Sequence, residues 1–407
     1  MSIKIFLVQS YFDGQKHHAQ GPYSIIAESG LVKEIHEGDI LKDRAGLSDK
    51  VETGGAQLYR CEFLMPGLVE GHSHLFLDGF ELDFKKRKSY LSASRDEMID
   101  VGNRNIADSL SAGITLIRDG GDNYGINHLL KADMANRNGL KPEIISPGRA
   151  IRKDGHYGGF IGIAVKDAED ILQALDDIAE SADNLKILLS GIIDFEKGEV
   201  KDPPQFSLEE TSLMVGTAHR LGLRTYAHCS GVEGLKIAVE AGVDSIEHGF
   251  FMNRDILAMM ADKNISWVPT FSPVYFQYER PELAGWNEQT VSRLEAILNN
   301  HFEHAALAVE MGVPTIAGSD AGSYGVPHGR GLIDELLFLD RAGIPLTATL
   351  SSATSVPRRS WNRESADIIP GNRVNFLELA DSPFVDIKNL NRPRRIFRDT
   401  FELSIAT

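Results

Sequence analysis

Short apolar runs alternate with longer segments of helical periodicity between Pro66 and about residue 360. The runs with the composition of buried strands are 67–74, 113–121, 142–148, 185–191, 224–230, 244–250, 265–271 and 315–322. One helical segment begins at Ser207, with Glu210 three residues later, which is the pattern of a capping box. No GxGxxG sequence follows a run, which disfavours an open doubly wound sheet. We therefore expect an α/β fold in which eight strand–helix repeats close into a (β/α)8 TIM barrel.

The two ends of the chain follow a different pattern. Residues 1–64 contain short alternating segments separated by Gly, Asp and Asn, which is typical of strands joined by turns. Residues 362–407 return to the same pattern. We expect these two segments to pair into a small β-sandwich, with the barrel, residues 65–361, inserted between them.

The composition restricts the class of protein and its partners. The 407 residues include 58 acidic and 42 basic side chains, a formal net charge of −16. This acidity argues against a nucleic-acid partner, because binding DNA or RNA depends on neutralising phosphates. Only Cys61 and Cys229 are present, which excludes a disulfide framework and favours a reducing compartment. Apolar runs are too short for a signal peptide or a membrane span, so we expect a cytoplasmic protein that acts on a small molecule.

Histidines and a carboxylate stand at the ends of several predicted strands. His72 and His74 end the run 67–74, and alternate residues of a strand face the same side. His228, His248 and Asp320 stand near the ends of three later runs. In TIM barrels the active site lies where the carboxyl ends of the strands meet. Because imidazole and carboxylate groups bind zinc-like ions, the pattern predicts a metal site.

Lys186 lies between Leu185 and Ile187 in the predicted fourth strand. A lysine inside a buried strand is unusual because burying a lone ammonium group is unfavourable. One interpretation is that its side chain extends to solvent at the barrel mouth. In another, a neutral lysine reacts with carbon dioxide to give a carbamate whose oxygens bridge two metal ions. With the histidines present, we expect the second interpretation and two divalent ions.

Several motifs resemble those of a known family and occur in the expected order. They are "VQSYFDG", "FLMPGLVEGHSH", "AGITLIRDGG", "LKILLSG", "TYAHCSG", "SIEHG" and "GSDAG". Over nearly its whole length the chain resembles the amidohydrolase superfamily, and within it the prolidase-like, imidazolonepropionase-related metal-dependent hydrolases. The resemblance implies two divalent ions, zinc foremost, and six ligands. The first ion would be held by His72, His74 and Asp320, the second by His228 and His248, with carboxylated Lys186 bridging both.

The resemblance also implies the chemistry and the substrate-binding residues. A hydroxide between the ions would attack a carbonyl, with Asp320 accepting its proton and passing one to the leaving nitrogen. The segment 148–162 is similar to the family's substrate loop, in which His156 would donate to the oxyanion. Three further residues follow from the sequence itself. Tyr226 lies two residues before His228 and should face the same interior, so we expect it to line the pocket, and we expect Arg149 and Arg152 to meet a substrate carboxylate.

These features leave several activities open. The main expectation is hydrolysis of an amide bond, as in a dipeptide or an N-acyl amino acid. A cyclic-amide hydrolase, a lactonase and a mononuclear deaminase are alternatives, although Gly231 stands where such deaminases carry a glutamate. A metal-free scaffold is a further alternative of a different class, disfavoured by the six intact ligand positions. Relatives of this kind often assemble, so we expect a homo-oligomer.

Overall fold

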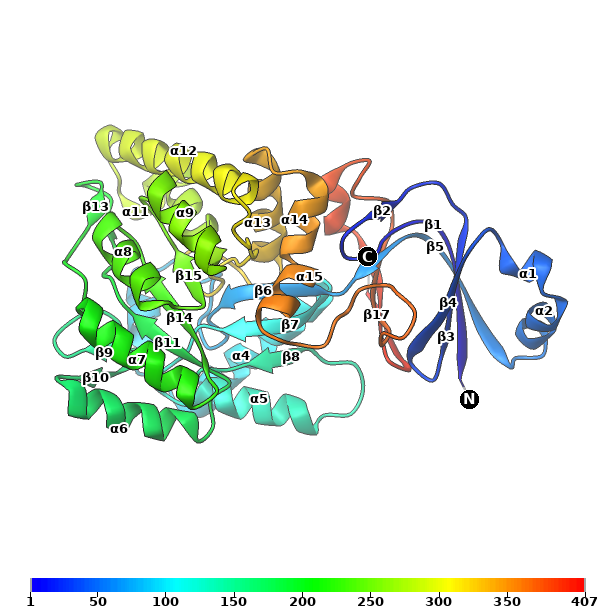
Figure 1. The fold of residues 1–407 in the computed structure, drawn as a ribbon, viewed down its shortest axis with the longest axis horizontal. Helices are drawn as coiled ribbons and strands as arrows, with labels where there is room; N and C mark the ends of the chain where they lie inside the picture. The colour runs from blue at the N-terminus through cyan, green and yellow to red at the C-terminus, as the bar shows by residue number, and fades with distance from the viewer. Residues whose placement is uncertain (1, 406–407) are drawn as a thin grey trace.

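A computed structural model describes residues 2–405 and shows an α/β body joined to an elongated β unit (Figure 1). The β unit is a single mixed sheet in the order β19-β18-β17-β5-β1-β3-β4, with β2 paired to β1. Its strands are β1 (Ile3–Phe12), β2 (His17–His18), β3 (Tyr23–Glu28), β4 (Leu31–Glu37), β5 (Ala56–Pro66), β17 (Asn375–Leu379), β18 (Pro393–Arg398) and β19 (Phe401–Ser404). The unit expected to be a two-sheet sandwich therefore has all its strands in one sheet.

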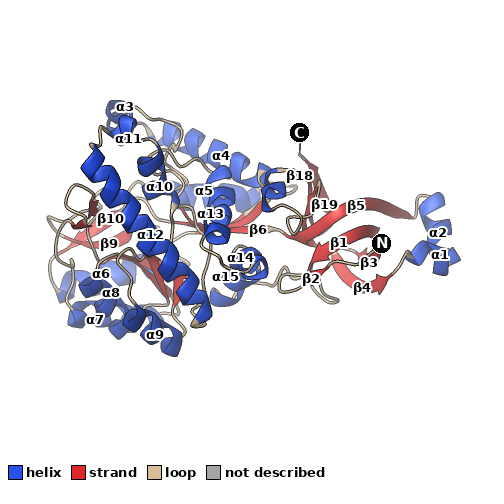
Figure 2. Ribbon diagram, turned by 90° about the horizontal axis from the view of Figure 1, so that it is seen from above, coloured by secondary structure: helices blue, strands red, loops and turns tan. Residues whose placement is uncertain are grey.

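Both faces of this sheet bury apolar side chains. On one face the ring of Phe6 packs edge-on against Phe376 and Phe397, with centroids 5.3 and 4.9 Å away. On the other face Ile5 and Ile40 belong to a second cluster. Ile40 begins α1 (Ile40–Asp43), which with α2 (Ala45–Glu52) lies at the end of the unit away from the body (Figures 1 and 2). Contacts between the N-terminal and C-terminal strands therefore hold this unit together.

Parallel strands form the centre of the body. Two parallel sheets are present, in the orders β6-β7-β8 and β10-β9-β11-β14-β15-β16, beside an antiparallel hairpin of β12 and β13. The strands are β6 (Leu68–Ser73), β7 (Ile114–Asp119), β8 (Glu143–Ile145), β9 (Ala150–Lys153), β10 (Gly162–Val165), β11 (Asn184–Leu188), β12 (Ile193–Asp194), β13 (Glu199–Val200), β14 (Arg224–Cys229), β15 (Ser245–His248) and β16 (Ser266–Val268). Strands β6, β7, β11 and β15 are fully buried, which is typical of parallel strands covered by helices.

Helices lie around these sheets (Figure 2). They are α3 (Phe84–Tyr90), α4 (Arg95–Ser111), α5 (Ile126–Asn136), α6 (Ala168–Ala179), α7 (Leu208–Arg220), α8 (Val232–Ala241), α9 (Arg254–Lys263), α10 (Ser272–Glu279), α11 (Pro281–Ala284), α12 (Glu288–Glu310), α13 (Arg330–Arg341), α14 (Leu346–Ser352) and α15 (Ser355–Ser360), with a 3₁₀ turn η1 (Ile387–Asn391). The predicted capping box of Ser207 and Glu210 is confirmed at the start of α7. Among the helices of residues 2–405, none combines the length and apolarity needed to cross a bilayer.

The eighth predicted strand, 315–322, forms isolated bridges rather than a regular strand. Trp267 pairs with Thr315, and Ser73 pairs with Ala321, both in parallel. The amide of Asp320 donates to the carbonyl oxygen of His72 at 2.7 Å. The segment therefore lies between β16 and β6, although the two parallel sheets are not joined into one continuous sheet.

Candidate metal centre

The six predicted ligands come together at the end of the body where the parallel strands finish. They are His72 in β6, His74 directly after it, Lys186 in β11, His228 in β14, His248 at the end of β15 and Asp320 in the segment after β16. Parallel strands present their carboxyl ends at one edge, which explains why side chains so far apart in the sequence meet here.

The spacing of these groups suits metal coordination. Nε2 of His72 and Nε2 of His74 lie 3.7 and 3.5 Å from Oδ1 of Asp320. Ligand atoms of these three residues lie within 4.8 Å of one another. Ligands at about 2.0–2.2 Å from a zinc ion lie roughly 3–4 Å apart. The His248 ring continues the cluster, with its centroid 5.2 Å from that of His72 and 4.5 Å from that of His228. The donor set therefore fits divalent ions.

Lys186 lies against this cluster rather than extending to solvent. Its side chain is buried, and Nζ lies 3.3 Å from Nε2 of His72. Burial lowers the pKa of Lys186 to about 8, against the opposing effect of Asp320. A neutral amine is therefore accessible at this position near neutral pH.

The histidines are held in the neutral form that binds metals. Burial is the main cause that lowers the pKa of His72, His74 and His248 well below its ordinary value, and that of His228 to about 4. Burial also raises the pKa of Asp320 to about 6, against the opposing effect of Lys186. Neutral imidazoles leave their lone pairs free for an ion.

A buried carboxylate orients His72. Oε2 of Glu247 lies 2.6 Å from Nδ1 of His72, and Oε1 accepts from Nη2 of Arg118 at 2.6 Å. Nε of Arg118 donates to the carbonyl oxygen of Gly71 at 2.8 Å, which ties the guanidinium to β6 itself. An acceptor at Nδ1 fixes the tautomer in which Nε2 faces the ion.

Other contacts restrict the remaining ligands. Nδ1 of His248 lies 2.7 Å from Oγ1 of Thr270. His248, Thr270 and Asp320 have φ angles of 67°, 51° and 55°, in the left-handed region that non-glycine residues rarely adopt. Such backbone strain concentrates at functional sites. A Cβ atom at Gly120 would lie 2.5 Å from Cε1 of His74, so only glycine leaves room for this ring.

The predicted substrate residues are placed less favourably than the ligands. His156 and Arg149 are exposed, and Arg152 donates to the carbonyl oxygens of His156 and Gly162 at 3.1 and 3.3 Å. The structure therefore does not bring these three side chains to the cluster. His156 and Arg149 face solvent, and Arg152 instead binds the backbone of the loop between β9 and β10. Tyr226 does face the interior, but its hydroxyl donates to the carbonyl oxygen of Asp119 at 2.8 Å.

Tyr157 and Glu247 are functional candidates that the sequence reasoning missed. The Tyr157 ring lies 5.6 Å from that of His228. Glu247 is fully buried beside His72. The available signal for Glu247 was a charged residue within a short buried strand, next to a predicted ligand. Tyr157 had no comparable signal beyond its position next to His156.

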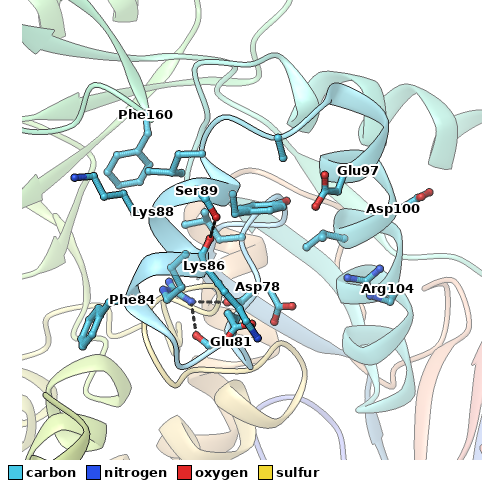
Figure 3. A pocket seen from close by; sticks show the side chains of 16 residues that line it. Asp78, Glu81, Phe84, Lys86, Lys88, Ser89, Glu97, Asp100, Arg104 and Phe160 are labelled. Atoms are coloured by element: carbon cyan, nitrogen blue, oxygen red, sulfur yellow. Dashed lines mark hydrogen bonds and ion pairs between the residues drawn. The ribbon is translucent and has the colours of Figure 1, made fainter.

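Cavities of different sizes lie near this end of the body. One of about 250 Å³ is lined by His228, His248 and Asp320 among others. A larger one of about 830 Å³ lies between α3 and α4, where Figure 3 shows side chains such as Phe84 and Arg104 around it. None of the six predicted ligands lines the larger cavity. Of these two cavities, the smaller one is therefore the one from which a substrate would reach the cluster.

Known proteins have sequences similar to this chain. A protein of Mycobacterium tuberculosis without a described function is 27% identical over 346 residues, 84% of each chain. Ochratoxinase of Aspergillus niger is 24% identical over 249 residues, 60% of this chain and 50% of that enzyme.

Solved structures show the same fold. A Xaa-Pro dipeptidase with bound methionine superposes with a TM-score of 0.81 at 21% identity, covering 99% of this chain and 100% of that one. The A. niger ochratoxinase structure superposes with a TM-score of 0.79 at 20% identity, covering 98% and 95%. The profile of the amidohydrolase family matches residues 63–391, which is most of the sequence. The chain therefore belongs to the amidohydrolase family.

Proposed function

We propose that the protein is a hydrolase that uses two divalent metal ions, zinc foremost, to cleave an amide bond of a small molecule. The observation that carries the proposal is the convergence of four imidazoles, Asp320 and Lys186 at one end of the parallel strands. Family membership and the likeness to ochratoxinase and a Xaa-Pro dipeptidase support an amide bond as the target.

The proposal includes a closed (β/α)8 barrel as the scaffold. The segment 315–322 would serve as the eighth strand. Its support is the set of backbone hydrogen bonds on both sides: the amide of Ile316 donates to Trp267 at 2.8 Å, and the amide of Gly71 donates to Ala317 at 2.9 Å. A closed barrel would place all six ligands around one mouth.

We assign His72, His74 and Asp320 to one ion and His228 and His248 to the other, with Lys186 as a bridging carbamate. The grouping of the first three within 4.8 Å supports the first assignment. The 4.5 Å between the ring centroids of His228 and His248 supports the assignment of these two to the other ion. The burial of Lys186 and the 3.3 Å between its Nζ and Nε2 of His72 support its bridging role.

The bound ions and Asp320 would have different roles in hydrolysis. Divalent ions held here would lower the pKa of a bound water and polarise the carbonyl group of the substrate. Asp320 has Oδ2 occupied by the hydroxyl of Ser323 at 2.9 Å, while Oδ1 faces His72 and His74. Oδ1 would take the proton of the attacking water and deliver a proton to the leaving nitrogen.

Tyr157 would donate a hydrogen bond to the substrate carbonyl oxygen. Its ring lies beside His228, and it lines the same cavity as Asp320. Burial raises the pKa of the Tyr157 hydroxyl, so it keeps its proton at neutral pH. A donor aimed at the developing negative charge stabilises the transition state.

Metal analysis combined with a substrate panel tests the proposal. We expect about two zinc ions per chain and hydrolysis of at least one acyclic amide, lost with a chelator and restored by zinc. Cleavage of lactones alone would replace the proposal with a lactonase. One ion per chain with ammonia release would indicate a mononuclear deaminase. A protein without metal and without hydrolysis would be a scaffold.

A further inference from the structure

The cavity beside the cluster has mainly apolar walls away from the ligands. It measures about 250 Å³, whereas pockets for drug-sized ligands are roughly 300–1,000 Å³. Its apolar and aromatic walls include Ile192, Ile193, Phe195, Phe250, Val274 and Tyr324. A space of this size and lining suits one ring or one short branched chain.

Two hydroxyl groups that line the cavity already form hydrogen bonds with side chains of the cluster. Oγ1 of Thr270 lies 2.7 Å from Nδ1 of His248. The hydroxyl of Ser323 donates to Oδ2 of Asp320 at 2.9 Å. These hydroxyls position ligands and are not free to solvate a charged substrate group.

No side chain that lines the cavity offers a lysine or arginine charge to a substrate carboxylate. None of the described residues that line it is a lysine or an arginine. Arg149 and Arg152 are not among them, and Arg152 donates to carbonyl oxygens of its own loop. A carboxylate seated between the apolar walls, away from the ions that the cluster would hold, would have no lysine or arginine as a partner, and burying an unpaired charge is unfavourable.

We propose that the substrate group seated in this cavity is uncharged and apolar, such as an aryl or branched alkyl substituent. This inference rests on the proposed amide hydrolysis and narrows it. Water adds across the C–N bond, which releases a carboxylic acid and an amine. An amide that carries a free carboxylate on the seated group is rejected, which disfavours ordinary dipeptides and N-acyl amino acids.

Pairs of amides that differ only in a carboxylate test this inference on the zinc-loaded enzyme. One pair is butyranilide and 4-butyramidobenzoate, and others replace the aryl ring with branched alkyl groups. We expect kcat/KM to be at least about 10-fold higher for the neutral members. Ile192→Arg places a guanidinium on the half-exposed cavity wall and should raise the relative kcat/KM of the carboxylates by about 10-fold. Leu172→Arg, on the outer surface of α6, adds the same charge elsewhere and should leave the ratio unchanged.

The outcomes separate this inference from the proposed function. Equal rates within the pairs, or faster hydrolysis of the carboxylates, would overturn the inference and leave amide hydrolysis standing. Hydrolysis limited to amides with a free carboxylate would likewise overturn the inference and leave amide hydrolysis standing. An enzyme with two ions that cleaves no amide of the panel would overturn both.

Discussion

Replacing Glu247 with glutamine keeps the shape of the side chain but removes the negative charge shared by His72 and Arg118. Its two oxygens each lie 2.6 Å from these partners, and all three side chains are almost completely buried. In the Glu247→Gln variant the amide group no longer holds His72 in a fixed tautomer with the same strength. Loss of such supporting contacts lowers metal affinity or activity by about 10- to 100-fold.

The same substitution also affects folding stability. Arg118 is only 2% exposed, and without Glu247 its charge is left without its carboxylate partner. Breaking a buried ion pair at one partner reduces stability by roughly 3–5 kcal/mol. Adding Arg118→Met removes the orphaned charge, so the double variant should regain much of this stability. It should not regain metal affinity, because the acceptor for His72 is still missing.

Zinc affinity is measured by competition with a chromophoric chelator, and stability of the same samples by denaturant unfolding. Glu378→Gln is the matched control, because Glu378 is also buried and pairs with Arg395 at 2.5 Å, but in the terminal sheet. It should lower stability and leave zinc affinity unchanged. Zinc affinity of Glu247→Gln within twofold of wild type would refute the reasoning. An equal loss of affinity in the control would show that the effect is general loosening of the fold.

Three further predictions concern other buried groups. Lys186→Met should lower metal content and kcat together, as followed by metal analysis and steady-state kinetics, and unchanged activity would contradict the bridging role. Tyr157→Phe should lower kcat by roughly 100-fold with little change in metal content, because one donor to the carbonyl oxygen is lost; an unaltered kcat would exclude that donor. Burial lowers the pKa of His301 to about 3, so between about pH 3 and pH 6.5 the unfolded chain binds a proton at this residue that the folded chain does not. The free energy of unfolding should therefore decrease as the pH is lowered, by roughly 3 kcal/mol from this group between pH 6.5 and pH 4. Denaturant unfolding of His301→Gln should show a correspondingly smaller decrease over the same pH range.

Hydrophobic periodicity was sufficient to predict most parallel strands and the residues at their ends. The run 67–74 contains β6, and the run 244–250 contains β15. The eighth run is less regular because Asp320 adopts a positive φ and Gly318 lies close to the backbone of β6. Periodicity describes regular strands and carries no information on such local departures.

Loop orientation was not predictable in the same way. The loop before β10 turns His156 outward and Tyr157 toward His228, a difference of one residue. A glycine-rich segment has no repeating pattern that fixes which side chain faces the site. Similarly, the orientation of His72 depends on Glu247, which pairs in turn with Arg118, and these two residues come from two other strands. Charges buried in strands were the available clue, but their pairing depends on tertiary structure.

The pairing of β5 with β17 gives the C-terminal part of the chain a role in assembling the metal centre. β5 ends at Pro66, and after Gly67 the chain enters β6 with His72 and His74. One edge of β5 pairs with β1, but its other edge pairs with β17, which begins at Asn375. During translation that edge stays open until β17 has been synthesised, because β17 follows all the strands and helices of the α/β body in the sequence. Secure anchoring of the first two ligands is therefore a late event in biogenesis.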